Sequence, residues 1–261
     1  MNDTYRKPLI LITNDDGADA RGIEVLTRLM LQIGDVVVVA PDGPRSAQSN
    51  ALTVTQPIRF NEIERKEGLI RYNCTGTPTD CVKLALNEIV ERQPNLLVSG
   101  INHGSNSAIN VIYSGTMGAV HEGCENGIAS IGFSINSHSP EVDFTELEKY
   151  VLKIASEALK NGLPHAVCLN VNAPCGKIDG IKVARQCDGR WTKEFAKRTD
   201  PRGRDYFWLT GNFENHEPEM EDTDEWAIDH GFISIVPTKI DLTAYEAMDE
   251  IRSWEFGLES L

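Results

Sequence analysis

Two adjacent aspartates, Asp15 and Asp16, come just after a short apolar run, Leu9–Thr13, and are followed by Gly17. Like charges this close raise each other's pKa unless a cation lies between them. A hard divalent ion such as Mg²⁺ or Mn²⁺ prefers oxygen ligands of this kind. The pair therefore indicates a metal site, and the alternative is a pair of turn aspartates that cap the next helix.

A second loop rich in oxygen ligands runs from Ala40 to Asn50, after the next apolar run. Ser46 offers a neutral hydroxyl to an ion, Arg45 offers a positive charge, and Asn50 offers an amide that can hydrogen-bond a substrate oxygen. On its own such a loop is typical of a flexible connection. Its position after a second parallel strand places it at the same sheet edge as the aspartates.

A third loop, Ser99–Asn106, contributes an amide oxygen on Asn102, and Gly100 and Gly104 allow the backbone to approach a ligand closely. The loop matches neither the P-loop nor the Gly-x-Gly-x-x-Gly pattern. The fingerprints of nucleoside triphosphate and dinucleotide binding are therefore absent from it.

A fourth segment, Ser114 to Thr116, begins a helix. Ser114 is a favourable N-cap, and Gly115 and Thr116 would present free N–H groups to a phosphate. Together the four segments supply carboxylates, a hydroxyl, an amide and an anion site, which is the equipment of metal-assisted phosphoryl chemistry. A Gly-x-Ser-x-Gly elbow is missing, which argues against an α/β-hydrolase.

The elements that must position these loops alternate between apolar runs and helical periods up to about residue 171. This alternation is typical of an α/β domain with a mainly parallel sheet, whose ligands bind beyond the carboxyl ends of the strands. The patterns predict strands at 9–13, 35–40, 95–99, 128–135 and 165–171, a hairpin of 51–60 with 69–73, and helices at 23–33, 79–91, from 114, and at 144–160.

The character of the chain changes after about residue 175. Lys182–Arg204 carries eight basic and three acidic residues, whereas Glu214–Asp229 carries eight acidic residues and no basic ones. A strand is expected between them at Asp205–Leu209. Neighbouring blocks of opposite charge are typical of solvated hairpins. The alternative is a projecting arm that exchanges contacts with another subunit.

Beyond these blocks, a strand is expected at Phe232–Val236, ended by Pro237, and a terminal helix at Thr243–Trp254 with Thr243 as its N-cap. The whole chain, 1–261, is predicted to be one domain. It divides into an α/β core at 1–175, an arm region at 176–240 and a terminal helix at 241–261.

Composition limits the partners. The 261 residues include 25 Lys and Arg against 39 Asp and Glu, a net charge of −14, so polymeric nucleic acid and anionic membranes are repelled. The six cysteines form no Cys-x-x-Cys pair and are expected to be reduced thiols. The first apolar run is too short for a signal peptide, and no run is long enough to span a membrane. A cytoplasmic location is expected.

Taken in order, the motifs resemble the SurE family, the survival-protein-E 5′-nucleotidases. The resemblance rests on Asn14–Gly17, Ala40–Asn50, Ser99–Asn102 and Tyr113–Thr116, and it extends to Asp241-Leu242-Thr243, so that it covers almost the whole chain. It implies a Rossmann-like, three-layer α/β/α core with a C-terminal hairpin arm and a terminal helix. It also implies a homodimer or homotetramer with exchanged arms.

The activity implied by this resemblance is metal-dependent hydrolysis of nucleoside 5′-monophosphates, extending to 3′-nucleotides and short polyphosphate. One divalent cation per subunit, Mg²⁺ or Mn²⁺, would be bound. The implied metal ligands are Asp15, Asp16, Ser46 and Asn102; the catalytic residues are Asp15, Asp16 and Asn50; the phosphate-binding residues are Asn50, Gly104, Ser114, Gly115 and Thr116.

Several alternatives stay open at this point. His103 and His121 stand where the family has small or apolar residues, and His103 is either a surface histidine or a phosphate donor. The attacking group is either a water activated at the ion or one of the aspartates. A haloacid-dehalogenase-type phosphatase needs Asp-x-Asp, which the adjacent pair does not supply. A non-catalytic nucleotide or metal sensor on the same fold is the rival from another class.

Overall fold

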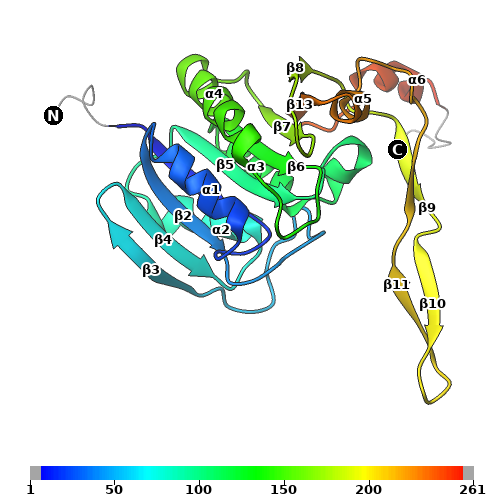
Figure 1. Cartoon of the computed structure of the whole chain (residues 1–261), viewed down its shortest axis with the longest axis horizontal. Helices are drawn as coiled ribbons and strands as arrows, with labels where there is room; N and C mark the ends of the chain where they lie inside the picture. The colour runs from blue at the N-terminus through cyan, green and yellow to red at the C-terminus, as the bar shows by residue number, and fades with distance from the viewer. Residues whose placement is uncertain (1–6, 255–261) are drawn as a thin grey trace, which may run out of the picture.

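A mostly parallel sheet with helices on both faces forms the body of the protein (Figure 1). The computed structural model describes residues 7–254. Within them the main sheet has nine strands in the order β3-β4-β2-β1-β5-β6-β7-β13-β8. The strands are β1 Leu9–Thr13, β2 Asp35–Pro41, β3 Phe60–Lys66, β4 Leu69–Cys74, β5 Leu96–His103, β6 Ser130–Ile135, β7 Val167–Ala173, β8 Gly180–Val183 and β13 Phe232–Lys239.

Six neighbouring strands of the sheet run parallel to one another, namely β4, β2, β1, β5, β6 and β7. At one side β3 pairs antiparallel with β4, and at the other side β13 pairs antiparallel with β7. This confirms the predicted α/β class. The central strands are continuous apolar runs because helices cover both of their faces. In β1, Ile10 and Ile12 face one core, and Leu9 and Leu11 face the other.

Two pairs of helices make the outer layers. On one face, α1 Arg21–Met30 and α4 Thr145–Asn161 bury apolar residues at helical spacing. On the other face lie α2 Pro78–Leu84, which continues into a π-helical turn at Ala85–Ile89, and α3 Gly115–Glu125. The result is a three-layer α/β/α arrangement. Among the residues described, no helix has both the length and the apolar character that a membrane crossing requires.

Some predicted boundaries are wrong. The first strand of the hairpin was expected at 51–60, but it is β3, Phe60–Lys66. A tight turn at Gly68, with φ +73°, joins β3 directly to β4, so β4 pairs with the residues that come just before it in the chain. Pro237 does not end β13. It pairs with Leu169 of β7 where the pairing with β8 has already stopped at Ile235. A residue without an N–H is tolerated at such a free edge.

The projecting arm is shorter than the predicted region 176–240. Strand β8 and strand β13 belong to the main sheet, and α5 Asp224–Asp229 packs against β13. The arm itself consists of two short antiparallel ladders that extend away from the body (Figure 1). Its strands are β9 Gly189–Thr192 with β12 Asn212–Asn215, and β10 Phe195–Thr199 with β11 Asp205–Leu209.

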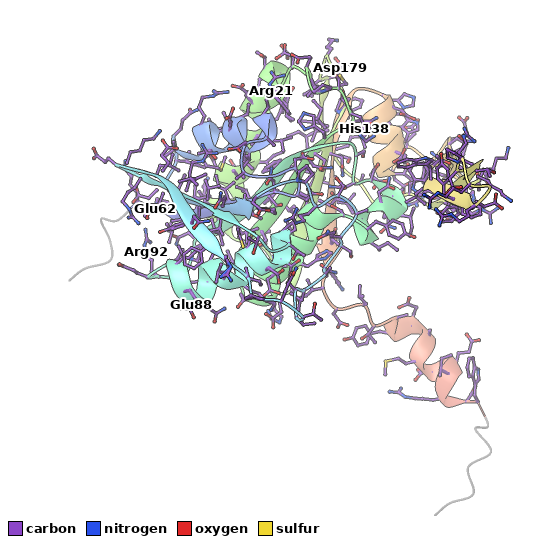
Figure 2. All side chains as sticks on the ribbon, turned by 90° about the horizontal axis from the view of Figure 1, so that it is seen from below. Arg21, Glu62, Glu88, Arg92, His138 and Asp179 are labelled. Atoms are coloured by element: carbon purple, nitrogen blue, oxygen red, sulfur yellow. The ribbon has the colours of Figure 1, made fainter. Side chains whose placement is uncertain are left out.

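The terminal helix is also shorter than predicted. A 3₁₀ turn, Tyr245–Ala247, leads into α6, Met248–Arg252. Thr243 does not cap it; its own N–H donates to Asp241 Oδ1. Figure 2 shows α6 standing away from the body. Residues 255–261, which the predicted terminal-helix region 241–261 includes, lie outside the described part of the chain.

Candidate active site

The predicted loops meet at one cavity of about 580 Å³ at the carboxyl edge of the sheet. It lies where β1 and β5 end, between the start of α3 and the base of the arm. Its lining combines carboxylates, amides, hydroxyls and a few aromatic rings: Asp15, Asp16, Ser46, Ala47, Asn102, His103, Gly104, Ser105, Asn106, Ser107, Asn110, Tyr113, Ser114, Asn136, His138, Trp191, Phe213 and Glu225.

Asp15 is the buried carboxylate of this cavity, with 5% of its surface exposed. Thr116 Oγ1 donates a hydrogen bond of 2.6 Å to its Oδ1. The first turn of α3 can approach this closely because residue 115 is glycine, where a Cβ would lie 2.9 Å from Asp15 Cβ. Burial raises the pKa of Asp15 to about 6, with a further contribution from the charge of Asp16 and an opposing one from Thr116.

Asp16 is more exposed than Asp15, and His103 contacts its Oδ2 atom. The backbone N–H of His103 donates to Asp16 Oδ2 at 3.3 Å, and the ring Nδ1 lies 3.4 Å from the same atom. The His103 ring packs edge-on against Phe144 at 5.6 Å, and its Nε2 is buried without a hydrogen-bond partner. His103 is therefore a partly buried residue of the cavity and not a surface histidine.

Asn102 presents a free amide oxygen because its nitrogen is already engaged. Its Nδ2 donates to the carbonyl of Gly104 at 2.8 Å. The strand reaches this point through an irregular step at Gly100, whose φ of +124° suits glycine, and whose Cβ would lie 2.2 Å from the Phe133 carbonyl. Strand β5 thus continues to His103, past the end predicted at Ser99.

The loop after β2 brings Ser46 to the cavity. The Arg45 backbone N–H donates to the Asp15 carbonyl at 2.7 Å, which ties this loop directly to the loop that carries the aspartates. Further along, the Ser49 N–H donates to the Tyr113 carbonyl at 3.2 Å. Ser46 therefore lies between two points where the loop is anchored.

Three predicted site residues are not among those that line this cavity: Gly115 and Thr116, in the first turn of α3, and Asn50. The loop turns at Ala47 and Ser49, both with positive φ, and Asn50 lies further along α3, near Gly118 and His121. There its Oδ1 lies 3.2 Å from His121 Nδ1. Asn50 therefore lies beside α3 and outside this cavity, and its contact with a substrate stays a prediction.

The start of α3 has the geometry expected of an anion site. Ser114 caps the helix, accepting the Met117 N–H at 3.0 Å. The N–H groups of Gly115 and Thr116, in the first turn, have no partner within the helix. The predicted N-cap is confirmed, and it lies beside Asp15 at the wall of the cavity.

Much of the cavity lining was not predicted from the sequence. Trp191 and Phe213 come from the base of the arm, Glu225 comes from α5, and His138 follows β6. Figure 2 shows His138 at the end of the body nearer the arm. No local motif marks these residues, because they reach the cavity only through long-range packing.

The donor set suits a hard divalent cation. Two carboxylates, one of them buried at a high pKa, stand beside an amide oxygen and a hydroxyl, and no Lys or Arg is among the described lining residues. The described residues contain no cluster of three or more His, Cys, Asp or Glu that could hold a metal. A site here would therefore depend on Ser46 and Asn102, which supply neutral oxygens.

Comparison with known proteins identifies the family of this chain. A family model described as survival protein SurE matches residues 10–193. A 5′-nucleotidase SurE of Flavobacterium johnsoniae is 52% identical over 255 residues, which span 96% of this chain and 98% of that protein. A 5′-nucleotidase SurE of Phocaeicola vulgatus is 49% identical over 249 residues, 95% and 97% of the two chains.

A solved structure gives the same result. The crystal structure of the SurE protein from Aquifex aeolicus matches with a TM-score of 0.82 at 36% identity, covering 94% of this chain and 98% of that one. Fold and site together define a three-layer α/β protein with an acidic, oxygen-rich cavity at the carboxyl edge of its sheet. The chain belongs to the SurE family.

Gly118→Ala is expected to lower activity by displacing the loop that carries Ser46. A Cβ at residue 118 would lie 2.2 Å from the carbonyl oxygen of Ser49, so the loop must move. A shift near 1 Å at a reacting group costs about 100-fold, and we expect a loss of roughly 10- to 100-fold in kcat/KM. Gly43→Ala is the control in the same loop, because its Cβ would meet only Arg45 at 3.8 Å. Equal activities of the two variants would contradict this account.

Proposed function

We infer that this chain is a 5′-nucleotidase, a metal-dependent phosphatase that releases phosphate from nucleoside 5′-monophosphates. The observation that carries this inference is the meeting of Asp15, Asp16 and Asn102 with the first turn of α3 in one cavity. Its relatives, at about half identity over nearly the full chain, are named 5′-nucleotidases. The cavity is also large enough for a small organic ligand.

We propose that Asp15, Asp16, Ser46 and Asn102 hold one divalent cation, Mg²⁺ or Mn²⁺. When bound, the cation would neutralise phosphate charge and favour ionisation of a water molecule. The desolvated carboxylate of Asp15 supports this assignment, because a nearby cation would remove the free-energy cost of keeping it ionised.

The start of α3 and the backbone at Gly104 would bind the phosphate. The N–H groups of Gly115 and Thr116, in the capped first turn of α3, would donate to its oxygens and stabilise negative charge that develops there. The backbone at Gly104, in the same cavity, can approach the phosphate closely. Thr116 also fixes the orientation of the Asp15 carboxylate through its hydroxyl.

The test is phosphate release by the intact protein from AMP and GMP, with added Mn²⁺ or Mg²⁺ and after chelation. We expect turnover that depends on the cation and is lost with chelator. Tight nucleotide binding without phosphate release under every metal condition would contradict the proposal and favour a sensor.

We further propose that the arm exchanges contacts with a second copy of the chain, in a homodimer or homotetramer. Large apolar side chains of the arm lie in solvent in the single chain, including Phe195, Trp208 and Leu209, which are 64–67% exposed. Leu242, just before the 3₁₀ turn and α6, is 92% exposed. Exposed apolar groups gathered on projecting segments mark interaction surfaces.

Light scattering coupled to gel filtration would give the mass in solution, and we expect an even multiple of the 28.9 kDa chain. The paired substitution Trp208→Ser with Leu209→Ser should shift the mass toward the monomer, while Met220→Ser, at another exposed apolar residue outside the arm strands, should not. A monomeric intact protein would contradict the proposal.

A further inference from the structure

The lining of the cavity contains a third carboxylate, Glu225, besides Asp15 and Asp16. It lies on α5, and the hydroxyl of Ser107 donates a hydrogen bond to its Oε1. Ser107 is itself within 2.6 Å of the hydroxyl of Ser105, another lining residue. The Glu225 carboxylate is therefore held in one position at the wall of the cavity by this hydrogen bond.

The neighbouring residue fixes α5 in place. Asp224 is 1% exposed and accepts the N–H of Ala108 at 2.8 Å and the N–H of Cys187 at 2.9 Å. These bonds join α5 to the segment before α3 and to the segment before the arm. The position of α5, and with it of Glu225, is thus set by the fold.

Glu225 has no compensating cation. Among the ion pairs formed by residues 7–254, none includes it, and the described lining of the cavity contains no Lys or Arg. Arg185, in the basic segment 182–204, does not neutralise the charge of Glu225, because it forms ion pairs with Glu217 and Asp222. Burial raises the pKa of Glu225, and the same burial lets its negative charge act over a longer distance when ionised.

This arrangement discriminates between leaving groups. If the phosphate lies in the cavity beside Asp15, Asp16 and Ser114, the rest of the substrate has room to extend toward Glu225, Trp191 and Phe213, which line the same cavity. A nucleoside is uncharged there, and its ribose hydroxyls can donate to a carboxylate. A polyphosphate chain or a 3′-phosphate would instead bring negative charge beside an unpaired carboxylate, which is repulsive.

The arm base supplies the other part of the same subsite. Trp191 Nε1 donates to Asn110 Oδ1 at 2.8 Å, and its ring meets Phe213 edge-on at 5.9 Å. The indole is therefore held in a fixed position, where an aromatic surface is available to a planar base. A polyphosphate chain gains nothing from such a surface.

We propose that Glu225 is a specificity-determining residue that selects an uncharged, hydroxyl-bearing leaving group over an anionic one. Nucleoside 5′-monophosphates are then preferred to tripolyphosphate and to nucleoside 3′,5′-bisphosphates. This inference rests on the proposed phosphatase function and names the leaving group that the same site accepts.

The test compares Glu225→Gln with the intact protein at pH 8 and fixed free Mn²⁺, using AMP, adenosine 3′,5′-bisphosphate and tripolyphosphate. Gln keeps the size of the side chain and an oxygen that can accept from Ser107. We expect kcat/KM for the two anionic leaving groups to rise about tenfold relative to AMP, since the repulsive charge is removed. Glu221→Gln, an equal charge change at an exposed position outside the cavity, should leave the ratios unchanged.

Glu225→Asp provides a second readout, because it retains the charge and should retain discrimination close to that of the intact protein. Unchanged ratios in Glu225→Gln, or the same change in Glu221→Gln, would overturn the proposal while leaving AMP hydrolysis intact. Failure of the intact protein to hydrolyse AMP at all would instead contradict the proposed function.

Discussion

Asp15→Asn is expected to lower kcat/KM for AMP by about 1,000-fold or more, because it removes a charged ligand from the proposed cation and so loses several kcal/mol of transition-state stabilisation. Asn has nearly the same shape, and its oxygen can still accept the hydrogen bond from Thr116. The loss would therefore come from charge and not from unfolding. Phosphate release at saturating Mn²⁺ measures it.

Asp19→Asn is the matched control for this variant. Asp19 lies in the same loop and loses the same charge, but its side chain is exposed and lies outside the cavity. We expect activity within about twofold of the intact protein, as is usual for surface substitutions. Near-normal activity of Asp15→Asn would remove Asp15 from the set of metal ligands, whatever the result for Asp19.

Asp224→Ala is expected to lower the free energy of unfolding by about 3 kcal/mol or more. The carboxylate accepts backbone N–H groups from Ala108, Cys187 and Glu225, and its removal leaves buried donors without partners, each costing about 1–3 kcal/mol. Urea denaturation of the intact protein and the variant measures the difference, as a shift in midpoint at unchanged slope.

Asp222→Ala tests whether this effect is specific to the buried carboxylate. Asp222 is exposed, and its ion pair with Arg185 lies in solvent beside a second partner of that arginine, Glu217. Surface ion pairs of this kind contribute about 0–1 kcal/mol. If Asp224→Ala destabilises the protein no more than Asp222→Ala does, then Asp224 does not hold α5 and the arm base to the body.

The central strands and most helices could be predicted from local patterns. Runs such as Leu9–Thr13 and Asp35–Pro41 are apolar without interruption because both faces of the sheet are covered, and this property is visible in the sequence. The helix start at Ser114 was equally visible, because capping depends on neighbouring residues. The error at Pro237 arose where pairing with distant strands decides the local structure, whereas at Thr243 a local hydrogen bond to Asp241 replaces the predicted cap.

The sequence by itself identified the polar residues that meet at the carboxyl edge. Asp15 and Asp16 follow β1, Asn102 lies near the end of β5, and Ser114 caps α3, and parallel strands bring such ends to one edge. The tertiary structure alone decided the rest of the site. It placed Asn50 beside Gly118 and His121 of α3, outside the cavity, and brought Glu225 and the arm base into the cavity, because these placements depend on left-handed turns and on hydrogen bonds between residues far apart in the sequence.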